Sequence, residues 1–237
     1  MNKHYAVTDL HGMWNLWEQI SCYCDKTDII YFLGDATDRG PDGIKIISAL
    51  LSDKRVRYIR GNHEEMLVEA AKTFNPYLLI YNGGRKTYED FMQIEYMDQQ
   101  ILINKLNILP NQLEYINTKG QRIILNHSGF TPELYEEWGK APFKKGVNLY
   151  TWDRDHFHRK WDGNENTYVV HGHTPTSYVI EFIDLKGGIY DKDADEILCY
   201  SNGHKFDLDI SSSITKKAAL FDLDKLKVEK YFKVEED

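Results

Sequence analysis

The sequence feature that most constrains the fold is a pattern of apolar run, polar loop and helix that occurs three times in succession. The apolar runs HYAV, IIYFL and VRYI each end in a loop rich in Asp, Asn, His and Gly. Each loop is followed by a stretch in which apolar residues have helical spacing. Because loops at the carboxyl ends of strands in an open α/β sheet gather at one edge, the pattern predicts that the three polar loops meet there.

The remainder of the chain is predicted to be a helical region followed by a β-rich part. The helical region spans about 76–113, contains NGGRKTYEDF and is closed by Pro110. Strand-like runs follow in LEYIN, RIILNHSGF, TYVVHGHTP, YVIEFI (178–183), KKAALFDLD and KVEKYFKV. A chain of 237 residues can bury one large core, so we expect a single domain over 1–237, with the helical region as an accessory to it.

Charge and cysteine content limit the class of partner and compartment. The 37 acidic residues outnumber the 29 basic ones, and the net charge of -8 disfavours nucleic acid and anionic lipid as partners. No apolar run approaches the roughly 20 residues that span a bilayer, so no membrane association is expected. An odd number of cysteines and a start without signal-peptide features predict a cytoplasmic protein. Cys22 and Cys24 lack a second pair for a metal site, which favours helix packing.

Potential metal ligands follow the apolar runs in the five segments DLHG, GDATDRG, GNHE, NHSGF and HGHTP. Asp9 and His11, two apart on an extended segment, would point the same way. One carboxylate of GDATDRG can bridge two ions, and the amide oxygen of Asn62 can bind one. Each segment alone has an ordinary explanation, such as an Asp-rich turn or a histidine at the edge of the core. Together they predict a metal centre with mixed nitrogen and oxygen ligands.

These five segments, in this order, resemble the calcineurin-like metallophosphoesterases, and in particular the bacterial phosphoprotein phosphatases. The resemblance extends from about Asp9 to about Asp224. It implies an α/β fold, a four-layer β-sandwich of two mixed sheets flanked by helices. A dinuclear centre would lie between the sheets. The ligand set suits two divalent ions, for which Mn is favoured, with Fe or Zn as alternatives.

The resemblance also implies how the ligands are shared. The first ion would be held by Asp9, His11 and Asp35. The second would be held by Asp35, Asn62, His127 and His173, so that Asp35 bridges both. The ligand in the related proteins is the histidine of a Gly-His pair, which here is His173. His171 is then a neighbour whose role stays open.

The resemblance and the chemistry of phosphoryl transfer agree on a mechanism. A hydroxide that bridges the two ions would attack phosphorus in line with the leaving group. His63, oriented by Asp38, would protonate the leaving oxygen. The phosphoryl oxygens would be bound by Arg39, Asn62 and Arg154. Arg154 has the alternative of an ion pair with Asp153 or Asp155, and Arg60 and Arg85 are weaker candidates.

The predicted enzyme is a metal-dependent phosphomonoesterase of the protein serine/threonine phosphatase type. Its substrate would be a phosphorylated protein, a small phosphoester or a nucleotide. The first alternative is a symmetrical dinucleoside tetraphosphate hydrolase, because NGGRKTYEDF resembles a segment shared by both bacterial groups. Another class is a non-catalytic metal-binding regulator, and a nuclease is disfavoured by the acidic balance.

Two departures affect the shape of the pocket: Thr8 replaces the usual glycine, and LDISSS stands where the related proteins often have Asp-Thr-Gly.

Overall fold

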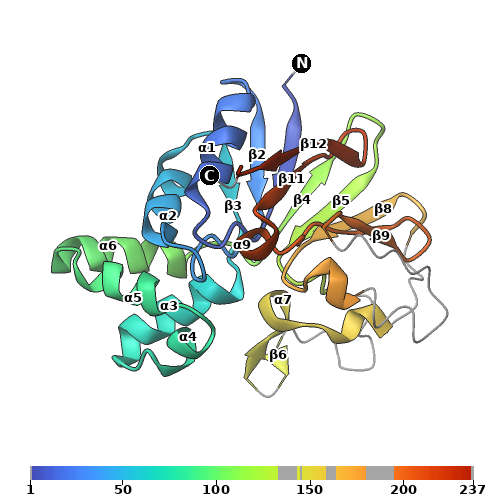
Figure 1. Cartoon of the computed structure of the whole chain (residues 1–237). Coiled ribbons are helices and arrows are strands. Elements are labelled where there is room, and N and C mark those ends of the chain that lie inside the picture. The colour runs from blue at the N-terminus through green and yellow to red at the C-terminus, as the bar shows by residue number, and fades with distance from the viewer. Residues whose placement is uncertain (1, 133–142, 145, 159–163, 180–194, 236–237) are drawn as a thin grey trace.

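The computed structural model of the chain describes residues 2–132, 143–144, 146–158, 164–179 and 195–235. Its first sheet has five strands in the order β12-β11-β1-β2-β3 (Figure 1). The strands are β1 (His4–Val7), β2 (Ile29–Phe32), β3 (Val56–Tyr58), β11 (Lys217–Asp222) and β12 (Lys227–Lys233). β1, β2 and β3 are parallel, with His4 opposite Ile29 and Ile30 opposite Val56. Their carboxyl ends therefore lie side by side at one edge, as the repeated pattern predicts.

The second sheet also has five strands, in the order β4-β5-β8-β10-β9. These are β4 (Gln112–Ile116), β5 (Arg122–Asn126), β8 (Thr167–His171), β9 (Leu198–Tyr200) and β10 (Lys205–Asp207). β5, β8 and β10 are parallel to one another, whereas β4 and β9 run antiparallel at the two sides. Both sheets are therefore mixed. The loops after β5 and β8 carry the segments NHSGF and HGHTP.

Two hydrophobic clusters explain why the sheets stack. Successive residues of a strand point to opposite faces, so Ala6 of β1 faces the second sheet while Tyr5 and Val7 face the helices. The cluster between the sheets also contains Leu125 and Val170. The other cluster joins the first sheet to helices α1 (Trp14–Tyr23), α2 (Gly43–Ser52) and α3 (Asn62–Thr73). The predicted fold class, two mixed sheets flanked by helices, is confirmed (Figure 1).

The accessory region is helical, as predicted. It consists of α4 (Tyr77–Tyr81), α5 (Arg85–Met92) and α6 (Tyr96–Asn107), which extend beside α3 (Figure 1). Leu79, Phe91 and Leu106 bury their side chains in the same hydrophobic cluster as α1 and α2. The region therefore shares a hydrophobic cluster with the first sheet.

The smaller elements complete the loop side of the molecule. They are β6 (Phe143–Lys144), β7 (Val147–Asn148), α7 (Leu149–Trp152), the 3-10 helix η2 (Asp155–His158) and α9 (Ser212–Thr215). The prediction of a strand in YVIEFI is wrong at its start, because Tyr178 and Val179 are helical and the helix begins right after Pro175. Residues 180–183 of that run lie outside the described residues.

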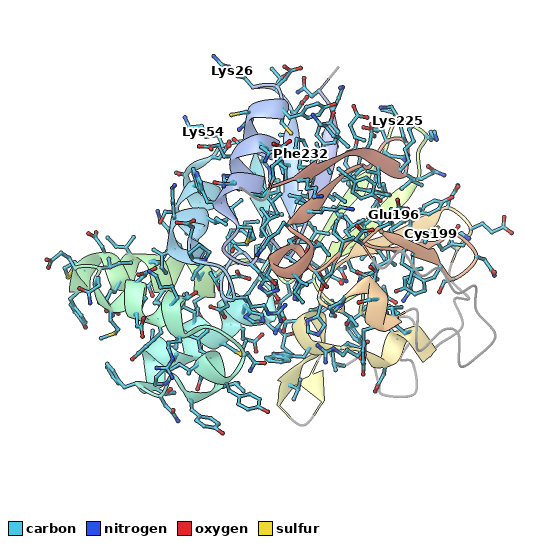
Figure 2. All side chains as sticks on the ribbon, viewed as in Figure 1. Lys26, Lys54, Glu196, Cys199, Lys225 and Phe232 are labelled. Atoms are coloured by element: carbon cyan, nitrogen blue, oxygen red, sulfur yellow. The ribbon has the colours of Figure 1, made fainter. Side chains whose placement is uncertain are left out.

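Near the margin of the first sheet, apolar side chains are buried and charged ones are exposed. Phe232 of β12 is buried, whereas Lys225 lies exposed on the turn between β11 and β12 (Figure 2). Cys22 on α1 is exposed, whereas Cys24, which directly follows the helix, is buried, so the predicted packing role holds for Cys24 alone. Across the described ranges, no helix combines the length and the apolar character needed to cross a bilayer.

Candidate active site

The predicted ligands converge between the two sheets from loops that are far apart in the sequence. They follow β1, β2, β3, β5 and β8, which is where the repeated pattern predicts a common edge. All of them are buried, with at most 5% of any residue exposed: Asp9, His11, Asp35, Asn62, His127 and His173. Burial of so many polar side chains is unfavourable unless they bind one another or a ligand.

The backbone around these ligands is strained. Asp9, His11, Asp35 and His173 have φ values of 51°, 43°, 59° and 74°, a left-handed region that residues other than glycine rarely adopt. The prediction that Asp9 and His11 lie on an extended segment is therefore wrong. Hydrogen bonds from the two residues' N–H groups to the carbonyls of Gly34 and Asp35 fasten their loop to the next one. Strain of this kind clusters at functional sites, where the surrounding structure enforces it.

One group of potential ligands surrounds the first position. The Nε2 atom of His11 lies 3.8 Å from Oδ1 of Asp9 and 3.8 Å from Oδ2 of Asp35. Its Nδ1 atom is 2.8 Å from the carbonyl oxygen of Thr37. Because that carbonyl requires a proton on Nδ1, the lone pair of Nε2 faces the two carboxylates.

A second group surrounds a neighbouring position. The Oδ1 atom of Asn62 lies 2.9 Å from Nε2 of His127 and 2.9 Å from Nδ1 of His173. Nε2 of His127 is also 3.3 Å from Oδ1 of Asp35. Its Nδ1 atom is held by the carbonyl of Leu33 at 2.8 Å. Asp35 therefore offers one oxygen to each group, which is the arrangement that a bridging ligand requires.

Unpartnered atoms provide a test of whether the site suits metal ions. Among the described residues, Oδ1 of Asp9, Nε2 of His11 and Nε2 of His173 are buried and have no hydrogen-bond partner. Two triads of residues could each hold an ion, because the ligand atoms within each triad lie within 4.8 Å of one another. These triads are His11–Asp35–His63 and Asp35–His127–His173. Buried lone pairs without donors match what divalent ions such as Mn, Fe or Zn bind. The donor set fits two such ions.

The ring of His63 is held between the side chains of Asp38 and Arg39. Its Nδ1 atom is 2.6 Å from Oδ2 of Asp38, and its Nε2 atom is 3.4 Å from Nη2 of Arg39. Nε2 also lies 3.7 Å from Oδ2 of Asp35. Asp38 and Arg39 are themselves held by the NGGRK segment, since the N–H of Arg39 donates to the carbonyl of Gly83. The segment shared by the two bacterial groups thus supports the pair beside the centre.

Glu64 is a functional residue that the sequence reasoning missed. Its carboxylate accepts hydrogen bonds from the N–H groups of Asp35, Ala36 and Gly61. The bond to Gly61 is one half of a capping box, so α3 begins at Asn62. An ideal Cβ on Gly61 would lie 2.2 Å from Oδ1 of Asp35, which only glycine avoids. The sequence did contain a signal for this role, because a glutamate three residues after a helix N-cap position is typical of a capping box.

Electrostatic effects separate the buried groups of the metal-free chain into neutral and charged ones. Burial lowers the pKa of His11 and of His173 well below the usual value, which keeps both rings neutral. Burial also disfavours the charged form of His127, but the Asp35 carboxylate outweighs it and raises the pKa of His127 to about 10. For His63, burial is likewise outweighed by the carboxylates of Asp35 and Asp38, so its pKa is raised.

The predicted phosphate-binding arginines lie at different positions. Arg39 contacts His63, as described above, and Arg154 is an exposed residue whose charge contributes to the lowered pKa of His173. Arg60 is directed elsewhere, because it donates to the carbonyl of Asn107 and to Oδ1 of Asn111. Arg39 therefore lies beside His63, and Arg60 is directed away from the ligand groups.

His171 belongs to a separate buried group, which we call the tyrosine–lysine cluster (His156, His171, Tyr200, Lys205 and Asp207). Nε2 of His171 is 2.7 Å from the hydroxyl of Tyr200, and Nζ of Lys205 is 3.4 Å from Nδ1 of His156. Burial lowers the pKa of Lys205 to about 7 and that of His171 to about 3. The cluster joins η2 to β8, β9 and β10.

Two stacked mixed sheets with a buried group of Asp, Asn and His at one edge define a metal-dependent phosphoesterase. The calcineurin-like phosphoesterase family model matches residues 3–212, and the chain belongs to that family. It is an enzyme of the metallophosphoesterase class, as the sequence predicts. The family match covers every predicted ligand.

Characterised relatives divide between two activities. Serine/threonine-protein phosphatase 1 of Salmonella typhimurium is 28% identical over 76% of this chain and 82% of its own length. A symmetrical bis(5'-nucleosyl)-tetraphosphatase of Buchnera aphidicola is 27% identical over 54% of this chain. That match spans only 45% of the relative, so the chain covers about half the length of several relatives it matches. The similarity leaves the substrate open.

Solved structures support the fold. A candidate diadenosine tetraphosphatase superposes with a TM-score of 0.62 at 16% identity, covering 98% of this chain and 93% of its own. A serine/threonine phosphatase from Saccharomyces cerevisiae superposes with a TM-score of 0.61 at 12% identity, covering 100% of this chain and 81% of its own. At these identities the likeness concerns the fold alone.

Proposed function

We propose that this enzyme hydrolyses phosphomonoesters and that it acts as a protein serine/threonine phosphatase. The observation that carries the proposal is the convergence of two ligand groups on Asp35, beside the pair that His63 forms with Asp38. The first ion is assigned to Asp9, His11 and Asp35. The second ion is assigned to Asp35, Asn62, His127 and His173.

The roles of the protein side chains follow from their charge and position. Two divalent ions in this site would supply charge to the phosphoryl group and would lower the pKa of water for attack. Arg39 and Arg154 bind the phosphoryl oxygens, because guanidinium groups form paired hydrogen bonds with such oxygens. Asn62 offers its amide N–H group to the same oxygens while its carbonyl oxygen faces the ligands.

His63 is the proposed general acid, and the leaving oxygen takes a proton from it. Asp38 fixes the ring through the 2.6 Å contact at Nδ1, which leaves Nε2 directed toward Asp35 and the centre. A histidine held in this way remains within reach of the leaving group at the moment the bond to phosphorus breaks. Despite the opposing effect of burial, the carboxylates of Asp35 and Asp38 raise the pKa of His63, which supports a role as the proton donor.

A pocket beside the centre favours a peptide as the leaving group. The pocket has a volume of about 590 Å³ and is lined by Glu65, Met66, Glu69, Leu78, Gly146, Val147 and Trp152. Trp152 links it to the centre, since its ring centroid is 6.2 Å from that of His173. The apolar walls suit an apolar side chain, and the two glutamates suit a basic one. They disfavour the extra phosphates of a dinucleoside tetraphosphate, whose charge would be repelled.

A two-substrate assay tests this proposal. The first substrate is a phosphoserine peptide with leucine and lysine next to the phosphoserine. The second is diadenosine tetraphosphate. Each is supplied separately with Mn²⁺, and the initial rates are compared. We expect the peptide to be cleaved faster, and a peptide with acidic neighbours serves as the matched control. Cleavage of the dinucleotide alone would establish the alternative, a symmetrical dinucleoside tetraphosphate hydrolase. Glu69→Lys, on the exposed rim, should shift the ratio toward the dinucleotide.

A non-catalytic regulator is the alternative from another class. A protein that had lost turnover would be expected to lack a ligand or the acid, whereas Asp35 and His63 are both present and buried. Release of inorganic phosphate from p-nitrophenyl phosphate, at a rate that depends on Mn²⁺, separates the two. Binding of Mn²⁺ without any such release would support the regulator.

A further inference from the structure

Thr8 makes a contact with a proposed metal ligand that depends on its hydroxyl group. It is buried at the end of β1, with 3% of the residue exposed. Its Oγ1 atom donates a hydrogen bond to Oδ2 of Asp9 at 2.5 Å. The same Oδ2 atom accepts a second hydrogen bond from the N–H of His173 at 3.1 Å. Both bonds hold one oxygen of the Asp9 carboxylate.

The two oxygens of Asp9 are therefore not equivalent. Oδ2 has two donors, whereas Oδ1 is buried and without a hydrogen-bond partner in the described part of the chain. Oδ1 is also the oxygen that lies 3.8 Å from Nε2 of His11. An ion between these two atoms would bind one oxygen of Asp9 and one nitrogen of His11. The other oxygen is occupied by donors from the protein.

Close packing keeps Thr8 in this position. An ideal Cβ on Gly172 would lie 2.1 Å from Oδ2 of Asp9 and 2.6 Å from both Oγ1 and Cγ2 of Thr8. Gly172 follows β8 of the second sheet and is fixed by the hydrogen bond from its N–H to the carbonyl of His127, which follows β5 of the same sheet. The Thr8 side chain thus fills the space between the two loops, and its hydroxyl has a fixed direction.

We propose that Thr8 is a positioning residue that selects Oδ1 of Asp9 as a single-oxygen ligand and preorganises the first metal position. The proposal rests on the metal centre of the proposed function, but not on the identity of the substrate. Partners that orient a ligand typically change metal affinity by about 10- to 100-fold. Loss of the hydroxyl should weaken the first position by that factor and leave the second position nearly unchanged.

Metal binding by the full-length chain provides the test, without any substrate. Thr8→Ala removes the hydroxyl, and Thr8→Ser, which keeps it, is the matched control. Each metal-free protein is titrated with Mn²⁺ in a calorimeter, and the Mn²⁺ retained per chain after desalting is counted. We expect two ions for the wild-type chain and for Thr8→Ser. Thr8→Ala should retain one, and the electron paramagnetic resonance signal of coupled Mn²⁺ pairs should be lost.

Each other outcome decides against the proposal. Equal affinities for Thr8→Ala and the wild-type chain, equal losses in Thr8→Ala and Thr8→Ser, or a loss at both positions would each overturn it. If the wild-type chain itself binds fewer than two ions, the proposed metal centre fails as well. Urea unfolding of the metal-free proteins checks that each variant folds. Thr8→Val, which retains the volume but not the hydroxyl, replaces Thr8→Ala if that variant is unfolded.

Discussion

The candidate metal centre and the tyrosine–lysine cluster are both buried groups of histidines, yet their unsatisfied atoms differ. In the centre, Nε2 of His11 faces two carboxylates, and neither this atom nor Nε2 of His173 has a hydrogen-bond partner among the described residues. In the cluster, Nε2 of His171 has the hydroxyl of Tyr200 at 2.7 Å. Buried lone pairs that lack a donor and converge on one position are suited to an ion.

The two histidines of the segment HGH belong to different groups although they are two residues apart. His171 ends β8 in a regular strand, and His173 follows Gly172 with a φ of 74°. The turn at Gly172 directs the two rings to different sides of the loop. Sequence spacing alone would have placed both on one face, so the local backbone decides which histidine is available as a ligand.

Loss of the shared carboxylate should have the largest effect. Asp35→Asn removes the charge that both ligand groups depend on, so both ions and the catalytic activity should be lost together. Since proton transfer alone is worth up to about 10⁴-fold, we expect the rate to fall by more than about 10⁴-fold. Mass-spectrometric metal counting and phosphate release measure the two effects. Full occupancy of both positions in this variant would show that Asp35 does not bridge.

The pair His173→Asn and His171→Gln should separate the two groups directly. His173→Asn should weaken the second ion by more than about 100-fold, since even the partners of ligands contribute about 10- to 100-fold. His171→Gln should retain both ions and lose about 0.5–1.5 kcal/mol of stability, because the hydrogen bond between the His171 ring and the hydroxyl of Tyr200 is removed. Metal counts and urea unfolding distinguish them. Loss of an ion in His171→Gln would mean that the two groups are not separate.

A smaller effect on the centre, without loss of metal, is expected at His63. His63→Asn should reduce turnover by roughly 10²- to 10⁴-fold on a substrate with a poor leaving group, because the proton donor is lost. On p-nitrophenyl phosphate, whose leaving group needs little protonation, the reduction should be smaller. Metal content should be nearly unchanged. If an ion is lost instead, His63 is a ligand in the His11–Asp35–His63 triad rather than the acid.

The sequence predicted the sheets and the residues that meet at their edge, but not how these residues are held. Apolar runs end where β1, β2, β3, β5 and β8 end, so the positions of the polar loops followed from periodicity. The left-handed backbone at Asp9 and the hydrogen bonds of Glu64 depend on contacts between loops distant in sequence. Lys205 is an ordinary lysine in a β-rich stretch of sequence. Only the packing of η2 against β10 makes it a buried one.

Lys205 provides the prediction with the smallest effect, which concerns stability alone. Burial lowers its pKa in the folded chain to about 7, whereas an exposed lysine has its usual value of 10.5. Between these values the unfolded chain binds more protons, so stability should rise with pH from about 7 toward 10.5. Lys205→Met should make this rise shallower, by at most about 1.4 kcal/mol per pH unit.

The exposed Lys54, labelled in Figure 2, supplies the matched control Lys54→Met. Urea unfolding between about pH 7 and 9 measures the slopes, and equal slopes for Lys205→Met and the wild-type chain would show that Lys205 is already charged in the folded protein.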